Sequence, residues 1–326
     1  MTHMTVAPPK SMPVGTSPRQ RVGIAGVQMQ VAYGHDNIPR IARLVAHTKH
    51  RFPWIELILF PELAVFGSDP SRAQSLPGEA EERLAEIARD HGVWLIPGSL
   101  FERDHDVMFN TAPVIAPNGT VAARYRKMFP FRPYEPNVEA GAGFVVFDIP
   151  AVARIGVSIC YDMWFPETTR TLAAMGAEVI LHPTMTDTID RDVELAIARA
   201  SAATNQCYFF DINGVGDGGI GRSLVVDQSG YVLHEGGHGQ EIIPILVDLD
   251  RIRTEREVGL RGLGQPLKSF RDRRVEFTVY DRSQRAAQYL ETLGPLIKPR
   301  APIDGNDSIT TVNREEAYVV RGDAGG

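Results

Sequence analysis

The sequence is poor in cysteine, in long apolar runs and in positive charge. Its 326 residues include two cysteines, Cys160 and Cys207, so a reducing cytoplasm in which both thiols stay free fits best. The longest apolar stretches, such as residues 144–160, are interrupted by Asp148 and Arg154, and none reaches the ~20 uncharged residues of a bilayer span. With 34 Lys and Arg against 40 Asp and Glu, the net charge of −6 disfavours nucleic acid as a partner.

The composition, 43% hydrophobic and 23% charged, is that of a soluble globular protein with room for two small domains or one large one. Residues 1–20 hold four prolines and lack the apolar core of a signal peptide, so we expect a flexible leader. Residues 260–302 are expected to form an arm between subunits, and residues 303–326 a flexible tail. The apolar residues expected to make the arm's contacts include Phe270, Phe277, Leu290 and Leu293.

Between these ends, apolar stretches of strand length alternate with stretches of helical periodicity. In the first half the expected strands are 22–29, 55–60 and 93–100, and the expected helices 38–51 and 78–91. In the second half the expected strands are 144–148, 153–159, 178–182, 208–212 and 242–249, and the expected helices 166–175 and 190–205. Hairpins are predicted at Asn118-Gly119 and Ser229-Gly230, and a long loop over 128–143. Strands covered by helices on both sides indicate a layered α/β fold, with the main domain over 21–259.

Two short motifs resemble functional signatures but lack the context that those signatures need. His234-Glu235-Gly236-Gly237-His238 has the letters of a zinc-protease helix, yet it leaves a predicted hairpin and its two central glycines oppose a helix. Gly214, Gly216 and Gly219 match a dinucleotide-binding pattern, but the next expected element is a strand and offers no helix N-terminus to a pyrophosphate. We interpret both motifs as turns.

Cys160 stands at a corner where a nucleophile could be activated. It follows the strand predicted over 153–159, and Pro166, which suits the first turn of a helix, comes shortly after it. Amides at a helix N-terminus favour a thiolate, so we expect the pKa of Cys160 to be lowered from ~8.5. The alternative is a small buried residue, because free cysteine is among the most buried residue types.

Two charged residues also follow predicted strands. Glu62 comes directly after an apolar strand, where a desolvated carboxyl would have a raised pKa suited to acid and base catalysis; the alternative is a structural loop cap. Lys127 ends a hairpin strand and precedes a proline-rich loop. An ammonium enclosed by that loop would stabilise an oxyanion, although a lysine at a strand end is usually solvated.

These residues resemble the nitrilase superfamily of carbon–nitrogen hydrolases, whose catalytic set is Glu, Lys and Cys in that chain order. The resemblance covers roughly residues 21–251. The matching motifs, at fitting spacing, are Phe60-Pro61-Glu62, Tyr125-Arg126-Lys127 and Ile159-Cys160-Tyr161-Asp162. The resemblance implies a four-layer α-β-β-α sandwich that assembles as a homodimer or higher homo-oligomer. It also implies a second catalytic glutamate, which Glu135 matches.

The residues after the nucleophile narrow the reaction. Nitrilases proper carry Trp-Glu after the cysteine and carbamoylases a basic cluster, whereas Tyr161-Asp162 followed by the apolar Met163-Trp164-Phe165 resembles the amidase branches. Omega-amidases carry Arg where this chain has Trp164, and that cation can pair with a substrate carboxylate. We therefore expect Tyr161 and Trp164 to contact a neutral substrate; the alternative is that Trp164 is a core residue away from the pocket.

The resemblance thus implies hydrolysis of a small neutral carboxylic amide to the acid and ammonia through a thioester. Cys160 would attack, Glu62 would move the protons, and Lys127 and the Tyr161 N–H would hold the oxyanion, with Glu135 orienting Lys127 or the substrate nitrogen. No metal, cofactor or membrane is required, and the partner is the small-molecule amide. The alternatives are hydrolysis of an N-carbamoyl compound or a nitrile by the same triad, and a non-catalytic scaffold of the same fold.

Overall fold

The computed structural model describes residues 20–281 and 286–298, so nearly all of the expected leader and the whole expected tail lie outside the described residues. The chain divides into two compact units. Unit 1 comprises Met1–Pro130 and Asn137–Val275, and unit 2 comprises Phe131–Pro136 and Glu276–Gly326. The arm expected over 260–302 is therefore shared between the two units.

Unit 1 is built on two mixed sheets. The seven-stranded sheet has the order β15-β1-β3-β4-β6-β5, with β7 paired to β6. Its strands are β1 (Arg21–Gln28), β3 (Leu57–Leu59), β4 (Trp94–Ile96), β5 (Leu100–Asp104), β6 (Val107–Ile115), β7 (Val121–Arg126) and β15 (Glu241–Asp248). The pairs β1–β3 and β3–β4 are parallel, whereas the other pairs in this sheet are antiparallel.

The six-stranded sheet has the order β14-β13-β11-β10-β9-β8. Its strands are β8 (Val145–Ile149), β9 (Ala153–Val157), β10 (Val179–Thr184), β11 (Tyr208–Asn213), β13 (Leu224–Val226) and β14 (Val232–Glu235). The parallel pairs β9–β10 and β10–β11 lie at its centre. A further two-stranded pair joins β2 (Gln30–Val31) to β12 (Val215–Gly216), and so links the first half of the chain to the second.

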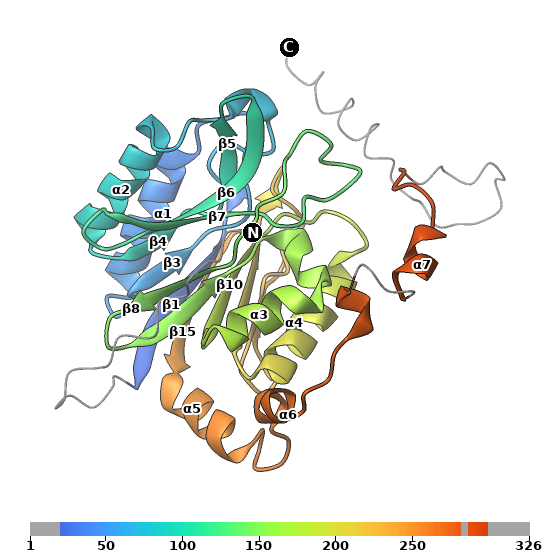
Figure 1. Ribbon diagram of the computed structural model, residues 1–326. Helices are drawn as coiled ribbons and strands as arrows, with labels where there is room; N and C mark the ends of the chain where they lie inside the picture. Colours follow the sequence, from blue (N-terminus) through green and yellow to red (C-terminus); the bar gives the residue numbers. More distant parts are fainter. Residues whose placement is uncertain (1–19, 282–285, 299–326) are drawn as a thin grey trace. The chain divides into compact units, whose positions relative to one another are not determined.

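Helices cover the outer face of each sheet (Figure 1). The seven-stranded sheet is covered by α1 (Ile38–Arg51) and α2 (Glu79–His91), and the six-stranded sheet by α3 (Pro166–Ala174) and α4 (Arg191–Asn205). Three apolar clusters match the three interfaces. One lies between the sheets, one between the seven-stranded sheet and α1 with α2, and one between the six-stranded sheet and α3 with α4. The expected four-layer α-β-β-α sandwich is confirmed.

The spacing of apolar residues in α1 explains why this helix packs one face on the seven-stranded sheet. Its buried residues are Ile38, Ile41, Leu44, Val45 and Thr48, spaced three and four apart, which gives one apolar face. A proline stands in its first turn, where its missing N–H costs no helical hydrogen bond. Basic residues in the last turn oppose the negative end of the helix dipole. The buried face therefore packs on the sheet while the charged face meets water.

Two parts of the structure differ from the expectation. The single strand expected over 93–100 is broken at Pro97-Gly98, and a second strand, β5, follows. Gly98 has φ +80°, and a Cβ added there would lie 1.7 Å from the Pro61 carbonyl oxygen, so the chain must turn at this point. The second difference lies beyond residue 251, where no element was expected and several helices form, beginning with α5 (Leu249–Val258). The apolar periodicity of α5 is too weak to predict a helix from the sequence, although its residues Leu249 and Ile252 are fully buried.

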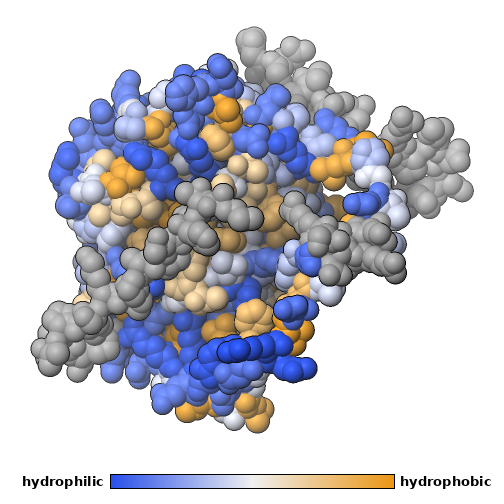
Figure 2. Space-filling model, in the orientation of Figure 1, coloured by the Kyte–Doolittle hydropathy of each residue, from blue (hydrophilic) through white to orange (hydrophobic). Residues whose placement is uncertain are grey.

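The end of unit 1 and unit 2 expose several apolar side chains. In unit 1, α6 (Pro266–Asp272) follows α5, and Figure 2 shows apolar surface beside charged surface where these helices lie. Unit 2 contains the 3-10 helix η3 (Thr278–Tyr280) and α7 (Ala286–Glu291). Its exposed apolar residues include Phe277, Leu290, Leu293, Leu296 and Ile297. In the described part of the chain, no helix is long and apolar enough to cross a membrane.

Candidate active site

Glu62 lies just beyond the carboxyl end of β3. Its side chain is 2% exposed, and Oε1 accepts hydrogen bonds from Lys127 Nζ and from Asn110 Nδ2, both at 2.8 Å. Its backbone N–H donates to the Thr184 carbonyl at the end of β10, so the other sheet also holds it. The residue is therefore held from both sheets, its carboxylate by residues of the seven-stranded sheet and its backbone by β10.

Lys127 follows β7 and is equally buried, with its side chain 2% exposed. Its backbone N–H donates to the Asn110 carbonyl on β6, and its carbonyl accepts from Gly141, which closes the long loop back on the strand. The ammonium is thus enclosed rather than solvated, and the carboxylate of Glu62 offsets part of its desolvation cost. Asn110 was not expected from the sequence, because an isolated asparagine in a strand carries no local signal.

Cys160 ends the chain segment that leaves β9 and begins the 3-10 helix η2 (Cys160–Trp164). Its φ of +45° places it in the left-handed region, which non-glycine residues rarely adopt and which costs of order 1–3 kcal/mol. Such strain persists only where the surrounding structure imposes it. The conformation makes the chain turn sharply at the thiol, as expected for a nucleophile presented at a strand end.

The thiol itself is neutral in this environment. Burial raises the pKa of Cys160 well above its usual range, the negative charge of Glu62 raises it further, and the positive charge of Lys127 acts in the opposite direction. The expectation that the corner would lower this pKa was wrong, because desolvation outweighs the local dipoles. A neutral thiol needs a base before it can attack, and the charged groups that act on it most are the carboxylate of Glu62 and the ammonium of Lys127.

Asp162 joins the two motifs and was missed as a site residue. Its carboxylate accepts hydrogen bonds from the Tyr125 hydroxyl at 2.6 Å and from the backbone N–H groups of Phe129 and Ile159 at 2.8 Å. These donors flank Lys127 on one side and Cys160 on the other. Burial raises the pKa of Asp162 to about 6. The sequence offered one signal for Asp162, because this carboxylate stands two residues after Cys160 within the motif Ile159-Cys160-Tyr161-Asp162.

Aromatic side chains surround the same corner. Phe129 and Phe165 stack with ring centroids 3.6 Å apart, and Tyr161 packs against Phe165 at 5.3 Å and against Trp164 at 6.2 Å. Trp164 is partly buried and packs against the apolar cluster beneath α3 and α4. The turn at Cys160 is therefore lined by aromatic side chains from η2 and its neighbours, whereas Glu62 and Lys127 are charged.

Comparison with known proteins places this geometry in a family. A sequence model described as "Carbon-nitrogen hydrolase" matches residues 21–257. The chain belongs to the carbon–nitrogen hydrolase family. It is 32% identical to a nitrilase from Pyrococcus abyssi over 272 residues, which cover 78% of this chain and 98% of that protein. It is also 30% identical to an omega-amidase from Xenopus laevis, over 68% of this chain and 86% of the relative.

Solved structures agree with this assignment. An amidase from Nesterenkonia is 26% identical, has a TM-score of 0.65 and covers 76% of this chain and 97% of its own. A variant of that amidase has been solved in complex with butyramide. The resemblance to the nitrilase superfamily and its amidase-like branch is thereby confirmed.

The second glutamate of this carbon–nitrogen hydrolase belongs to unit 2. Glu135 Oε2 accepts a hydrogen bond from the Phe131 N–H at 2.5 Å, inside the segment Phe131–Pro136. In the same segment the Phe131 and Tyr134 rings stack at 4.9 Å. The carboxylate thus orders its own loop, and a catalytic role for it remains a prediction.

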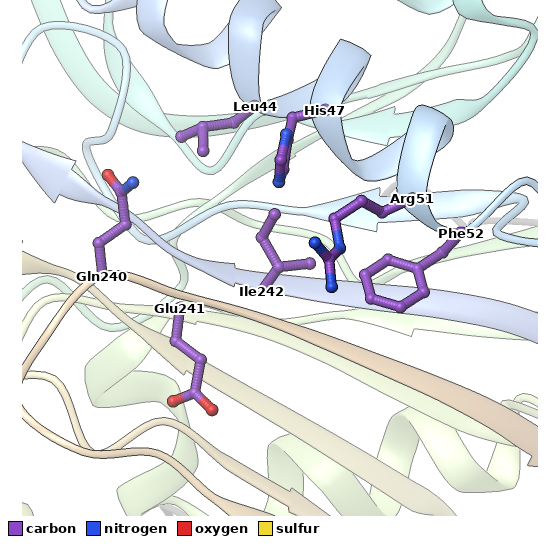
Figure 3. A pocket seen from close by; sticks show the side chains of 7 residues that line it. All are labelled: Leu44, His47, Arg51, Phe52, Gln240, Glu241 and Ile242. Carbon is purple, nitrogen blue, oxygen red and sulfur yellow. The ribbon is translucent and has the colours of Figure 1, made fainter.

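A pocket of about 330 Å³ lies elsewhere, between the end of α1 and the start of β15 (Figure 3). Its lining residues are Leu44, His47, Arg51, Phe52, Gln240, Glu241 and Ile242, none of which belongs to the catalytic set. Glu241 pairs with His234 at 2.7 Å.

The letters of a zinc-protease helix, which begin at His234 and end at His238, do not form a helix. His234 is on β14 and His238 lies in the following loop, where its Nδ1 contacts the Ile220 carbonyl, so these histidines do not share a helical face. Among the described residues, no cluster of three or more His, Cys, Asp or Glu could hold a metal ion.

Proposed function

We propose that this carbon–nitrogen hydrolase converts a small neutral carboxylic amide to the acid and ammonia, with Cys160 as the nucleophile. The observation that carries the proposal is the buried ion pair of Glu62 and Lys127, 2.8 Å apart, acting on a neutral buried thiol. A carboxylate beside a neutral thiol can take its proton, and an ammonium beside both can hold the oxyanion that forms.

The proposed reaction has two halves. Glu62 takes the proton of the thiol as the sulfur of Cys160 bonds to the amide carbon, and Lys127 Nζ and the Tyr161 N–H hold the oxyanion. The carbon–nitrogen bond then breaks, Glu62 gives its proton to the leaving nitrogen, and a thioester remains with free ammonia. Water attacks the thioester while Glu62 takes its proton; the carbon–sulfur bond breaks, the acid leaves, and the proton returns to the sulfur. In this scheme Glu135 orients Lys127 or the substrate nitrogen, as the family resemblance implies.

A neutral acyl group is proposed because of the residues around the corner. Tyr161, Trp164, Phe165 and Phe129 form an aromatic cluster, and Trp164 stands where omega-amidases carry arginine. An aromatic face cannot pair with a carboxylate. The butyramide complex of the Nesterenkonia amidase variant shows that this variant of a similar protein binds a short neutral amide. We further propose a reducing cytoplasm as the compartment, since both cysteines are free thiols.

Ammonia release tests the reaction itself. The full chain is incubated with a panel of short aliphatic amides, an N-carbamoyl compound and a nitrile, and the Cys160→Ala variant serves as control. We expect ammonia from the amides alone and a loss of turnover in the variant. Equal ammonia release by Cys160→Ala would remove Cys160 from the mechanism, and release from none of the substrates by either protein would favour a non-catalytic scaffold.

The choice of acyl group is tested by a matched substrate pair. The values of kcat/KM are compared for butyramide and for a four-carbon dicarboxylic monoamide of the same chain length. We expect the neutral amide to be preferred by at least about tenfold, which corresponds to ~1.4 kcal/mol of transition-state discrimination. Because the chain is also similar to omega-amidases, the assay must be able to detect a preference for the charged monoamide. A tenfold preference for the charged substrate would contradict the neutral-amide assignment. It would mean that an arginine elsewhere in the pocket pairs with the substrate carboxylate.

A further inference from the structure

A second group of buried polar residues lies beneath the nucleophile, on the helix-facing side of the six-stranded sheet. His182 on β10 is fully buried, and its Nδ1 is 2.7 Å from the hydroxyl oxygen of Ser158. Ser158 stands two residues before Cys160 and is 1% exposed. The sequence motifs of the reaction include neither residue.

Charged groups surround this pair. Asp211 on β11 is the register partner of His182 in the parallel sheet, and it forms an ion pair of 2.8 Å with Arg191 at the start of α4. Arg191 also contacts Glu194 at 3.1 Å, and Glu194 accepts from the Thr186 hydroxyl at 3.0 Å. The side chains of Asp211, Arg191 and Glu194 are at most 4% exposed. The group is therefore shielded from water on every side.

Serine, histidine and aspartate side by side would suggest a hydrolytic triad of their own. Their burial argues against this, because Ser158, His182 and Asp211 are each at most 1% exposed, so a substrate has no approach to the hydroxyl. The alternative is support of the neighbouring Cys160. The strand β10 contacts both halves of the site, since the Leu181 carbonyl accepts from the Ser158 N–H and the Thr184 carbonyl accepts from the Glu62 N–H.

We propose that His182 is a positioning residue for the nucleophile, which through Ser158 fixes the chain that turns at Cys160. The turn needs such support, because Cys160 is held at φ +45°. A rigid hydrogen bond two residues before the turn sets the direction of the thiol relative to Glu62 and Lys127. It also sets the direction of the N–H groups of η2 that receive the oxyanion.

The imidazole is suited to this task because it stays neutral. Burial lowers the pKa of His182 to about 4; Asp211 and a hydrogen bond at the Cys160 backbone raise it, and Arg191 and Lys127 lower it. Between pH 5 and 8 the ring therefore carries one N–H, and Nδ1 and the Ser158 hydroxyl can share a single hydrogen bond. The ring therefore acts on the turn at two points, through the Ser158 hydroxyl and through the backbone of Cys160.

The test compares two replacements of His182. His182→Leu fills the space without a partner for Ser158, whereas His182→Asn places a polar atom near the position of Nδ1. We expect kcat to fall roughly ten- to a hundredfold in His182→Leu and in Ser158→Ala, with KM within about threefold, because misplaced reacting groups lose rate more than binding. His182→Asn should retain most of kcat. The double variant His182→Leu, Ser158→Ala should be no slower than either single variant, since both remove one interaction.

A second readout separates positioning from general stability and does not depend on turnover. Iodoacetamide labelling of Cys160 at one fixed pH is followed by mass spectrometry. In His182→Leu and Ser158→Ala the rate of labelling should fall, because a displaced thiolate loses its alignment with Lys127. Cys207→Ser, just before β11 and away from the turn, is the control; it should lower the melting temperature and leave kcat and the labelling rate unchanged.

The proposal rests on the proposed function only for the turnover assay. If the wild-type protein releases no ammonia, that function fails while the labelling rate still reports on His182. If His182→Leu behaves like Cys207→Ser, with a lower melting temperature but unchanged kcat and labelling rate, His182 merely supports the core and the proposal is overturned.

Discussion

At the scale of single residues, the proposed nucleophile Cys160 combines a strained backbone with a neutral thiol. Desolvation raises the pKa of Cys160, and the charges of Glu62 and Lys127 act on it in opposite directions. An environment of this kind suppresses thiolate at rest, so in the proposed mechanism attack depends on the carboxylate that removes the proton. The proposal therefore makes the reactivity of Cys160 a property of the three residues together.

This dependence predicts the effect of Glu62→Gln. The amide keeps the size of the side chain but cannot accept the thiol proton, so the rate should fall by ~10²–10⁴. The control is Glu81→Gln, which removes a buried carboxylate on α2 that pairs with Arg124 of β7 at 2.6 Å. The control should lose stability and keep its rate. A loss of less than tenfold in Glu62→Gln would reassign Glu62 to structure.

Glu194 gives a pH-dependent prediction. Burial raises the pKa of Glu194 from 4.5 to about 7, so the folded state holds a proton that the unfolded state releases between these values. Stability from this group is therefore greatest at low pH and is lost as the pH rises to 7. Relative to Glu194→Gln, the wild type should lose of order 1–3 kcal/mol between pH 5 and 8. Urea unfolding at several pH values measures this difference, and an increase with pH would contradict the assignment.

At the scale of secondary-structure elements, the site depends on how strand ends meet. Glu62 follows β3, Lys127 follows β7 and Cys160 follows β9, so the two sheets must face each other in the right register before the residues converge. Asp162 connects these ends, since its donors come from β7, from the loop after it and from the residue before Cys160. Asp162 thereby links the position of the loop over 128–143 to the position of Cys160.

We expect Asp162→Asn to lose both stability and turnover. The amide cannot accept three hydrogen bonds, and its N–H groups would face backbone N–H donors, which costs about 1–3 kcal/mol. Tyr125→Phe is the matched variant, because it removes only one of the three donors and should cost less in each measurement. Thermal unfolding and kcat are measured side by side. Wild-type kcat in Asp162→Asn would show that the two strand ends are held without this carboxylate.

At the scale of the whole molecule, the sandwich and unit 2 have different surfaces. Unit 1 buries three apolar layers, whereas unit 2 exposes Phe277, Leu293, Leu296 and Ile297 by 49–69%. Exposed apolar groups of this density mark surfaces that associate. The arm between subunits therefore remains our prediction for this part of the chain.

Truncation after Val275 tests the arm. The cut is placed there because α5 belongs to the core through Leu249 and Ile252, so an earlier cut would damage unit 1. We expect the shortened protein to form a smaller assembly in light scattering, or to lose solubility, because the contacts between subunits are removed. A full-length variant with Leu293→Ser and Leu296→Ser controls for the loss of chain. The same assembly in all three proteins would show that the arm packs within one chain.

The sequence by itself determined the α/β class, most elements of the sandwich and the order Glu62, Lys127 and Cys160. These features depend on local periodicity and on motifs a few residues long, which the chain carries wherever it folds. It did not reveal α5, the break at Pro97-Gly98, the raised pKa of Cys160, the bridge made by Asp162 or the contact of His182 with Ser158. Tyr125 and Asp162 are 37 residues apart, and Ser158 and His182 are 24 apart, so each contact exists only once the strands have paired. Desolvation likewise follows from packing of the two sheets, because no single segment can bury Cys160 alone.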